Sequence, residues 1–140
     1  MARGFDFIFR PLGKGFRTVL GTLEAEVMDV VWAEGDVSVR EVHRRLERKR
    51  RIAYTTVMTT LARLARKGLL TRRLSDGAYR YAPAVSRDEL AGVVADSVID
   101  GLLEGFGRTA VARLVDRLQR EDPRQMAQLA RLIEERRRRR

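Results

Sequence analysis

The stretch from residue 52 to residue 83 constrains the fold more than any other part of the chain. From about residue 55 to 67, apolar residues recur at helical spacing, and Gly68 follows as a helix stop. Two short alternating segments then flank an Asp76-Gly77 turn, which is a strong signal for a β-hairpin. A helix, a glycine stop and a basic hairpin in this order are typical of a winged helix-turn-helix, which places the helix in a DNA groove and the wing beside it.

The helix predicted here has two unlike faces. Val57, Leu61 and Leu64 share one side and are expected to face the core. Four threonines in six positions weaken a helix, because the β-branch crowds the preceding turn, so a role for them on the outer face is favoured. Threonine hydroxyls bond phosphates and bases, and threonine methyls contact the thymine methyl. In the alternative interpretation Thr55 only caps the helix and the other threonines are incidental. The predicted DNA-contacting residues are Arg51, Tyr54, Thr55, Thr56, Thr59, Arg63, Arg66, Lys67, Arg72, Arg73 and Arg80.

Positive charge is concentrated in the middle of the chain. Residues 38–85 hold 13 Lys and Arg against 3 Asp and Glu, a net charge of +10, whereas residues 1–37 sum to −2 and residues 86–140 to +2. Such segregated charge is expected of a phosphate-binding surface. A basic surface that is merely solvated is the alternative. A protein that coats DNA without sequence preference, as an architectural protein does, is a further one that composition does not exclude.

The residue types needed for catalysis and metal binding are scarce. The chain has no cysteine, which excludes disulfides, thiolate metal sites and a cysteine nucleophile. Its one histidine, His43, has no neighbouring nitrogen ligand and no evident catalytic partner, so we expect a surface side chain. We predict no catalytic residue, no metal site and no cofactor, and therefore a protein that is not an enzyme.

Residues 1–21 are predicted to form an N-terminal extension that mixes aromatic and basic residues. The segment lacks the uninterrupted apolar core and the small-residue cleavage site of a signal peptide. No stretch of the chain approaches the roughly 18 apolar residues that span a bilayer. We therefore expect a cytoplasmic protein without membrane insertion.

Residues 22–85 are predicted to form the winged-helix DNA-binding domain. Its first helix is expected to begin with Thr22 as the cap, and Trp32 on that helix is expected to lie in the core or to plug a gap between helices. Ser38 and Glu41 form a capping box that starts a second helix. The basic hairpin then completes a mostly α (α+β) domain.

Residues 86–135 are predicted to form a helical dimerisation domain. Gly105 and Gly107 interrupt its first helix, and Asp122-Pro123 starts its last one. Amphipathic helices within about 50 residues make a poor core alone, so pairing with a second copy would bury their apolar sides. Residues 136–140 are expected to be a frayed, solvated arginine tail. The predicted dimerisation residues are Leu90, Val94, Val98, Leu102, Phe106, Leu114, Leu118 and Leu129.

Taken together, these segments resemble the penicillinase-repressor family (BlaI/MecI, with the copper-responsive CopY branch). The matching segments are residues 23–32, 38–42, 53–64 with Lys67-Gly68, and 79–83, and the resemblance spans about residues 20 to 118. It implies a homodimeric winged-helix repressor whose C-terminal helices dimerise. It also implies that the partner is double-stranded DNA with a dyad-symmetric operator. Release would follow an inducing signal, one route being proteolysis by a membrane sensor protease in a β-lactam-type response.

The chain departs from this family pattern in three places. Its first 20 residues extend beyond the usual start, and the cysteine cluster of the copper branch is missing, which excludes copper sensing through thiolates. The Asn-Phe bond at which some relatives are cleaved cannot exist, because the chain has no asparagine. Gly105-Phe106 is the nearest counterpart of that bond.

Overall fold

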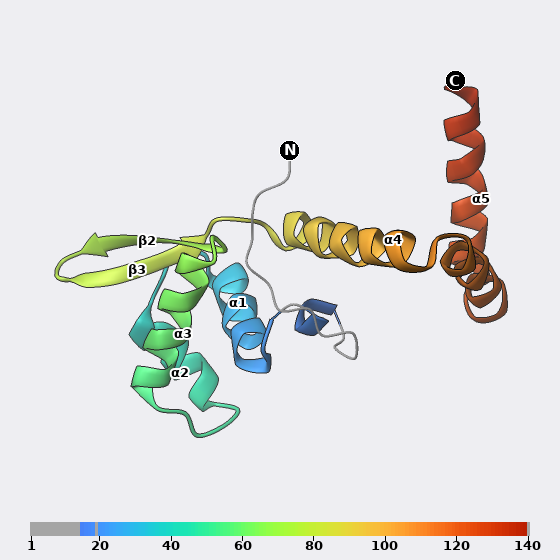
Figure 1. Cartoon of the computed structure of the whole chain (residues 1–140). Helices are drawn as coiled ribbons and strands as arrows, with labels where there is room; N and C mark the ends of the chain where they lie inside the picture. Colours follow the sequence, from blue (N-terminus) through green and yellow to red (C-terminus); the bar gives the residue numbers. More distant parts are fainter. Residues whose placement is uncertain (1–14, 19, 140) are drawn as a thin grey trace. The chain divides into compact units, whose positions relative to one another are not determined.

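The computed structural model describes residues 15–18 and 20–139, in two compact units that meet between Ala95 and Asp96 and are treated separately below. Most of the predicted N-terminal extension, residues 1–14 and 19, lies outside the described residues. We call the first unit the head and the second the C-terminal unit (Figure 1). The elements of the head are the 3-10 helix η1 (Gly15–Thr18), α1 (Thr22–Glu34), β1 (Val37–Ser38), α2 (Val39–Glu47), α3 (Tyr54–Arg66), β2 (Leu70–Ser75) and β3 (Ala78–Pro83), followed by the start of α4 (Arg87–Glu121).

The head has the winged helix-turn-helix fold that the sequence predicts. Three helices are followed by a hairpin, and β1 adds to it, so that the antiparallel sheet has the order β1-β3-β2. In Figure 1 the hairpin of β2 and β3 extends beyond the three helices as a wing. Asp76 and Gly77 both have positive φ, 51° and 78°. Two-residue hairpin turns of this kind are favoured because the twist of the turn matches the twist of the two strands. Asp76 tolerates this conformation better than most residues do.

One apolar core holds the head together. Val57, Leu61 and Leu64 are fully buried, which confirms the inward face predicted for the third helix. Leu90 and Val94 at the start of α4 belong to the same core, with 0% and 8% of their surface exposed. These two residues were predicted to contact a second copy. They pack inside the head instead, because the first turns of α4 dock there, and they leave the predicted dimerisation set.

Local side-chain hydrogen bonds lie at the starts of α1 and α2, and the predicted cap of α1 is corrected. Gly21, not Thr22, is the N-cap of α1, because the Glu24 carboxylate accepts a hydrogen bond from the Gly21 N–H at 3.0 Å. The predicted capping box of α2 is present, with the Glu41 N–H donating to Ser38 Oγ at 3.1 Å. The N-cap of α3 is Ala53, so Thr55 does not cap that helix.

Trp32 links α1 to the chain that enters α4. Its indole N–H donates to the Val85 carbonyl at 2.9 Å, and its ring lies 5.1 Å from the ring of Phe16. The Arg87 guanidinium lies 4.7 Å from the tryptophan ring centroid and also pairs with Asp29 at 2.9 Å. Trp32 therefore has the connecting role that was predicted for it, and it strengthens the attachment of α4 to the head.

The C-terminal unit contains the rest of α4 and α5 (Pro123–Arg138). Gly107 has φ 41° and ψ −112°, which breaks the helical path of α4 where the glycines predicted an interruption. Asp122 caps α5 by accepting from the Gln125 N–H at 3.3 Å, with Pro123 as the first helical residue. The helix continues to Arg138, so most of the arginine tail is helical, not frayed. None of the described helices combines the length and the apolar character needed to cross a membrane.

Candidate nucleic-acid interface

The outer face of α3 is the surface that the sequence predicts to contact DNA. Tyr54 and Met58, near its start, keep 45% and 43% of their surface exposed. Ala53, the N-cap, makes no side-chain hydrogen bond, so no side chain satisfies the first N–H groups of the helix. An uncapped helix start attracts phosphate through these groups and through the helix dipole. The other predicted residues in or beside α3 that are exposed are Arg51, Thr55, Thr56, Thr59, Arg63 and Arg66.

Thr59 and Thr60 in α3 use their hydroxyl hydrogens within the helix. Thr59 Oγ1 donates to the Thr55 carbonyl at 2.9 Å, and Thr60 Oγ1 donates to the Thr56 carbonyl at 2.8 Å. Thr60 is buried, with 4% exposed. The exposed Thr59 can therefore accept a hydrogen bond from a base or present its methyl group, but its hydroxyl hydrogen is already in use. Of the hydrogen bonds to DNA that the sequence suggested for Thr59, the structure therefore leaves only those in which its hydroxyl accepts.

A groove separates the start of α3 from the wing. It has a volume of about 470 Å³, and Tyr54, Met58 and Tyr79 lie along it. Beside it, the Arg72 guanidinium lies 4.2 Å from the centroid of the Tyr79 ring. Stacking on the ring orients this arginine without neutralising it, and no ion pair involves Arg72 within the described part of the chain. Arg72 is therefore well placed as a phosphate ligand, and Met58 is a surface residue of the groove that the sequence analysis missed.

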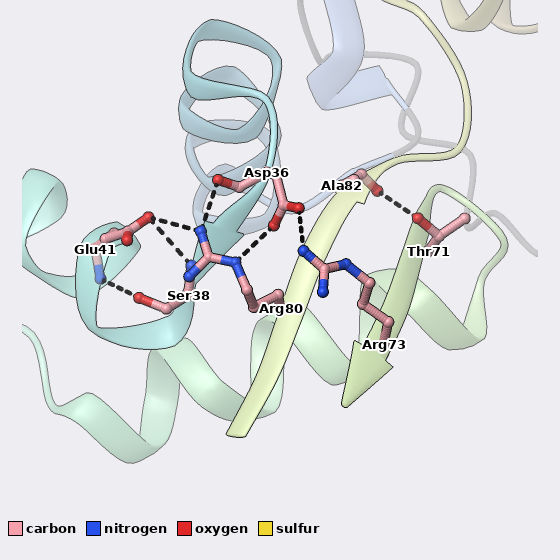
Figure 2. Close-up of polar contacts among 7 residues, drawn as sticks. All are labelled: Asp36, Ser38, Glu41, Thr71, Arg73, Arg80 and Ala82. Atoms are coloured by element: carbon pink, nitrogen blue, oxygen red, sulfur yellow. Dashed lines mark hydrogen bonds and ion pairs between the residues drawn. The ribbon is translucent and has the colours of Figure 1, made fainter. Parts of the chain in front are cut away.

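Arg73 and Arg80, by contrast, share an ion pair with the Asp36 carboxylate. They lie directly opposite each other on β2 and β3, and Figure 2 shows the Asp36 carboxylate between their guanidinium groups. Arg73 Nη2 donates to Asp36 Oδ2 at 2.6 Å, and Arg80 Nε donates to Asp36 Oδ1 at 2.8 Å. Arg80 Nη2 also donates to the Asp36 carbonyl at 3.1 Å and lies 3.7 Å from Glu41 Oε2. These two arginines were predicted to contact DNA, and the structure shows them in an ion-pair network.

The two arginines stabilise the ionised form of the Asp36 carboxyl. The hydrogen bonds from Arg73 and then from Arg80 lower the pKa of Asp36 below its ordinary value of 3.8. The same hydrogen bond raises the pKa of Arg80. At neutral pH the network is therefore one carboxylate shared by two guanidinium groups, with a second carboxylate, Glu41, further away.

Lys67 supports the fold at the end of α3. Its Nζ lies 2.8 Å from Glu24 Oε2, and Glu24 is only 7% exposed. Burial would raise the pKa of Glu24, but the hydrogen bonds from Lys67 and the Gly21 N–H, with the lysine charge, lower it overall. Lys67 was predicted to contact DNA. The structure assigns it a carboxylate partner 43 residues away, which no local pattern reveals.

His43 holds the connector that leads into α3. Its Nε2 lies 2.8 Å from the Ile52 carbonyl oxygen and 3.2 Å from Glu47 Oε1. Its ring meets the Tyr54 ring edge-on, with centroids 5.6 Å apart. The side chain is only 19% exposed, so the expectation of a surface histidine is wrong. Burial against the connector explains the difference: the histidine fixes where α3 begins. Among the described residues, no group of three or more His, Cys, Asp or Glu could hold a metal ion.

Known proteins resemble the chain over most of its length. The model of the penicillinase repressor family matches residues 20–135. The transcriptional regulator BlaI of Mycobacterium tuberculosis is 44% identical over 103 residues, which cover 72% of this chain and 75% of BlaI. A penicillinase repressor of Staphylococcus aureus is 24% identical over 88 residues, covering 63% of this chain and 70% of that protein. Streptococcus pneumoniae FabT in complex with DNA has a TM-score of 0.45 at 19% identity, over 88% of this chain and 81% of that one.

Proposed function

The chain belongs to the penicillinase repressor family, and we propose that it acts as a homodimer on a dyad-symmetric operator in double-stranded DNA. Membership makes it a DNA-binding transcriptional repressor and not an enzyme. In our proposal each copy places the start of α3 in a major groove, and Arg72 on the wing binds a nearby phosphate. Contacts of this kind to base edges give sequence preference, and contacts to phosphates give affinity.

The observation that carries the proposal is the surface of α3. An uncapped helix start, exposed side chains that suit base edges and exposed arginines lie on one face of one helix. Arg63 and Arg66 follow Thr55 and Thr59 on that face, so the polar contacts extend over more than one turn. A merely solvated basic surface does not account for an exposed tyrosine and methionine in the same place.

The C-terminal unit supports the homodimer. Its large apolar side chains are exposed to an unusual degree: Phe106 keeps 68% of its surface, and Leu114 keeps 54%. Contiguous exposed apolar residues of this size mark an interaction surface, and a second copy supplies a matching surface by symmetry. Of the predicted dimerisation residues, Val98, Leu118 and Leu129 are half-buried. We add Ile99, Leu103, Val111, Leu132 and Ile133, which are exposed beside them.

Release from DNA is proposed to act on the break in α4. Gly105, Phe106 and Gly107 lie at the point where the helical path is interrupted, and Phe106 is exposed. A cut there by a membrane sensor protease would separate the head from most of the dimer surface, and a small ligand that loosens the same helices is the other route. An immunoblot before and after a cell-wall antibiotic decides between them. Full-length protein that persists while the target genes are fully induced rules out cleavage.

The DNA-binding proposal is tested by selecting bound fragments from the native genome and measuring affinity for the recovered site and for random duplex. A specific repressor binds its site about 10³ to 10⁷ times more tightly than other DNA at physiological salt. An affinity ratio near one would favour the architectural alternative, in which the basic surface coats any duplex.

A further inference from the structure

We propose that Asp36 is a specificity-determining residue, which keeps Arg73 and Arg80 from binding DNA phosphates and so limits affinity for non-operator DNA. The inference rests on the proposed function, and it adds a residue that acts by pairing with arginines that would otherwise bind phosphates. It concerns the face of the wing that carries Arg73 and Arg80, which is opposite to the face that carries Arg72.

Both oxygens of the Asp36 carboxylate accept a hydrogen bond from an arginine. Asp36 Oδ2 accepts from Arg73 at 2.6 Å, and Asp36 Oδ1 accepts from Arg80 at 2.8 Å (Figure 2). Two arginines directly opposite each other on adjacent strands repel, and the shared carboxylate offsets that repulsion. Without it, the wing would present two close, mobile guanidinium groups to any phosphate backbone.

Free arginines on a wing bind phosphates without the need for a particular base sequence. Each phosphate neutralised by a cation adds about 0.9 to the slope of log affinity against log salt, whatever the bases are. Arg73 is well exposed, with 60% of its side chain accessible, so only its pairing with Asp36 limits such contact. The Asp36 side chain is itself 44% exposed, and its negative charge repels a phosphate that approaches this face. On an operator α3 fixes the position of the head, whereas on random DNA the head can take any position that brings these arginines to phosphates. Both effects therefore lower affinity for random DNA more than affinity for the operator.

A purely structural role makes a different prediction. Arg80 lies opposite Ser38 in the sheet and pairs with both Asp36 and Glu41. The network therefore also attaches the wing to the start of α2. If attachment were the only role of Asp36, its loss would weaken binding to operator and random DNA together. The two roles are therefore separated by the direction in which affinity for random DNA moves.

The experiment compares Asp36→Asn with Asp76→Asn in the full chain. Both remove one negative charge from the wing region, and asparagine tolerates the positive φ of residue 76. We expect Asp36→Asn to raise affinity for random duplex about tenfold and to steepen the salt slope by about 2 to 4 for a bound dimer, since up to four arginines are released. Asp76→Asn should change affinity for both DNAs by similar, smaller factors. The ratio of operator to random affinity should fall severalfold only for Asp36→Asn.

Further variants separate the charge of Asp36 from its shape and from the charge of Arg73. Asp36→Glu keeps the charge and should retain most of the wild-type ratio. Arg73→Gln alone should change random-DNA affinity little, because Arg73 is already paired, but it should reverse much of the effect of Asp36→Asn in the double variant. Asp36→Ser repeats the test if the asparagine variant folds poorly, as judged by thermal unfolding.

The proposal is overturned if Asp36→Asn and Asp76→Asn behave alike, or if the loss of Asp36 weakens binding to both DNAs. Failure of the proposed function looks different: the wild-type protein itself would then show no preference between the selected site and random duplex.

Discussion

Neighbouring side chains at the end of α3 have opposite roles. Arg66 is exposed on the outer face, whereas Lys67 pairs with the buried carboxylate of Glu24 at 2.8 Å. Removing one partner of a buried pair leaves the other charge without compensation. Within residues 15–18 and 20–139 no ion pair involves Arg66, so its removal should affect binding and not folding.

Lys67→Met should therefore lower the free energy of unfolding by about 3 kcal/mol. Arg66→Met, the matched control one residue away, should change it by less than about 0.5 kcal/mol and should weaken DNA binding. Urea unfolding and duplex titration of both variants provide the measurements. Equal destabilisation by the two substitutions would contradict the role given to Lys67.

The Glu24 pair also predicts a pH dependence. The pKa of Glu24 is lowered in the folded protein below its ordinary value of 4.5, so its stabilising contribution is complete above that value and is lost as pH falls through the folded-state pKa. The stability difference between wild type and Glu24→Gln should shrink as pH falls below 4.5. Urea unfolding at a series of pH values measures it, and a difference that stays constant down to pH about 3 would contradict the assignment.

At the scale of elements, the start of α4 belongs to the head. Leu90 is fully buried there, Val94 is 8% exposed, and Val85 accepts the hydrogen bond from Trp32. A chain that ends after Ala95 keeps these contacts, whereas one that ends after Ala84 loses them all. The two ends thus differ in the core of the head, although neither retains the exposed apolar residues of the C-terminal unit.

We expect the head ending at Ala95 to be folded and monomeric, and to bind a half-site weakly, because its two copies no longer share one binding event. The head ending at Ala84 should be less stable by at least about 3 kcal/mol, as expected for the loss of a buried leucine and its neighbours. Sedimentation and thermal unfolding test both. A dimeric Ala95 head would place the dimer contacts outside the C-terminal unit.

Elements with a strong local signal are those that sequence predicts well. The period of α3 places Val57 and Leu64 in the core, and the Asp76-Gly77 pair locates the hairpin turn. Contacts between residues far apart in the sequence cannot be predicted from such local patterns. The partners of Arg80 and Lys67 are 44 and 43 residues distant, and a cation in a basic stretch has the same sequence signature whether it binds DNA or a carboxylate.

The same limit applies to α4. An apolar stripe indicates which side of a helix is buried, but not whether its own domain or a second copy buries it. Leu90 and Val94 in the first two turns of α4 are buried in the head, while Leu102 and Phe106 further along stay exposed. Only the fold of the head, which brings Val85 beside Trp32, separates the two cases.

For the whole molecule, we expect a homodimer in which each copy presents the same DNA-binding surface. In the proposed dimer each head contributes the start of α3 and Arg72, and the apolar residues that are exposed in the C-terminal unit would join the copies. A twofold axis in the protein requires a twofold axis in the DNA, and half-sites on one face of the duplex are separated by about 10 base pairs or a multiple of that.

Hydroxyl-radical footprinting of the full chain on a fragment selected from the native genome tests this claim most directly. We expect two protected half-sites related by a dyad, in phase with the helical repeat. Both should weaken together when Thr59 and Arg63 are replaced by alanine. Continuous protection without phase on every fragment, or a single asymmetric site that the alanine variant still protects, would contradict it.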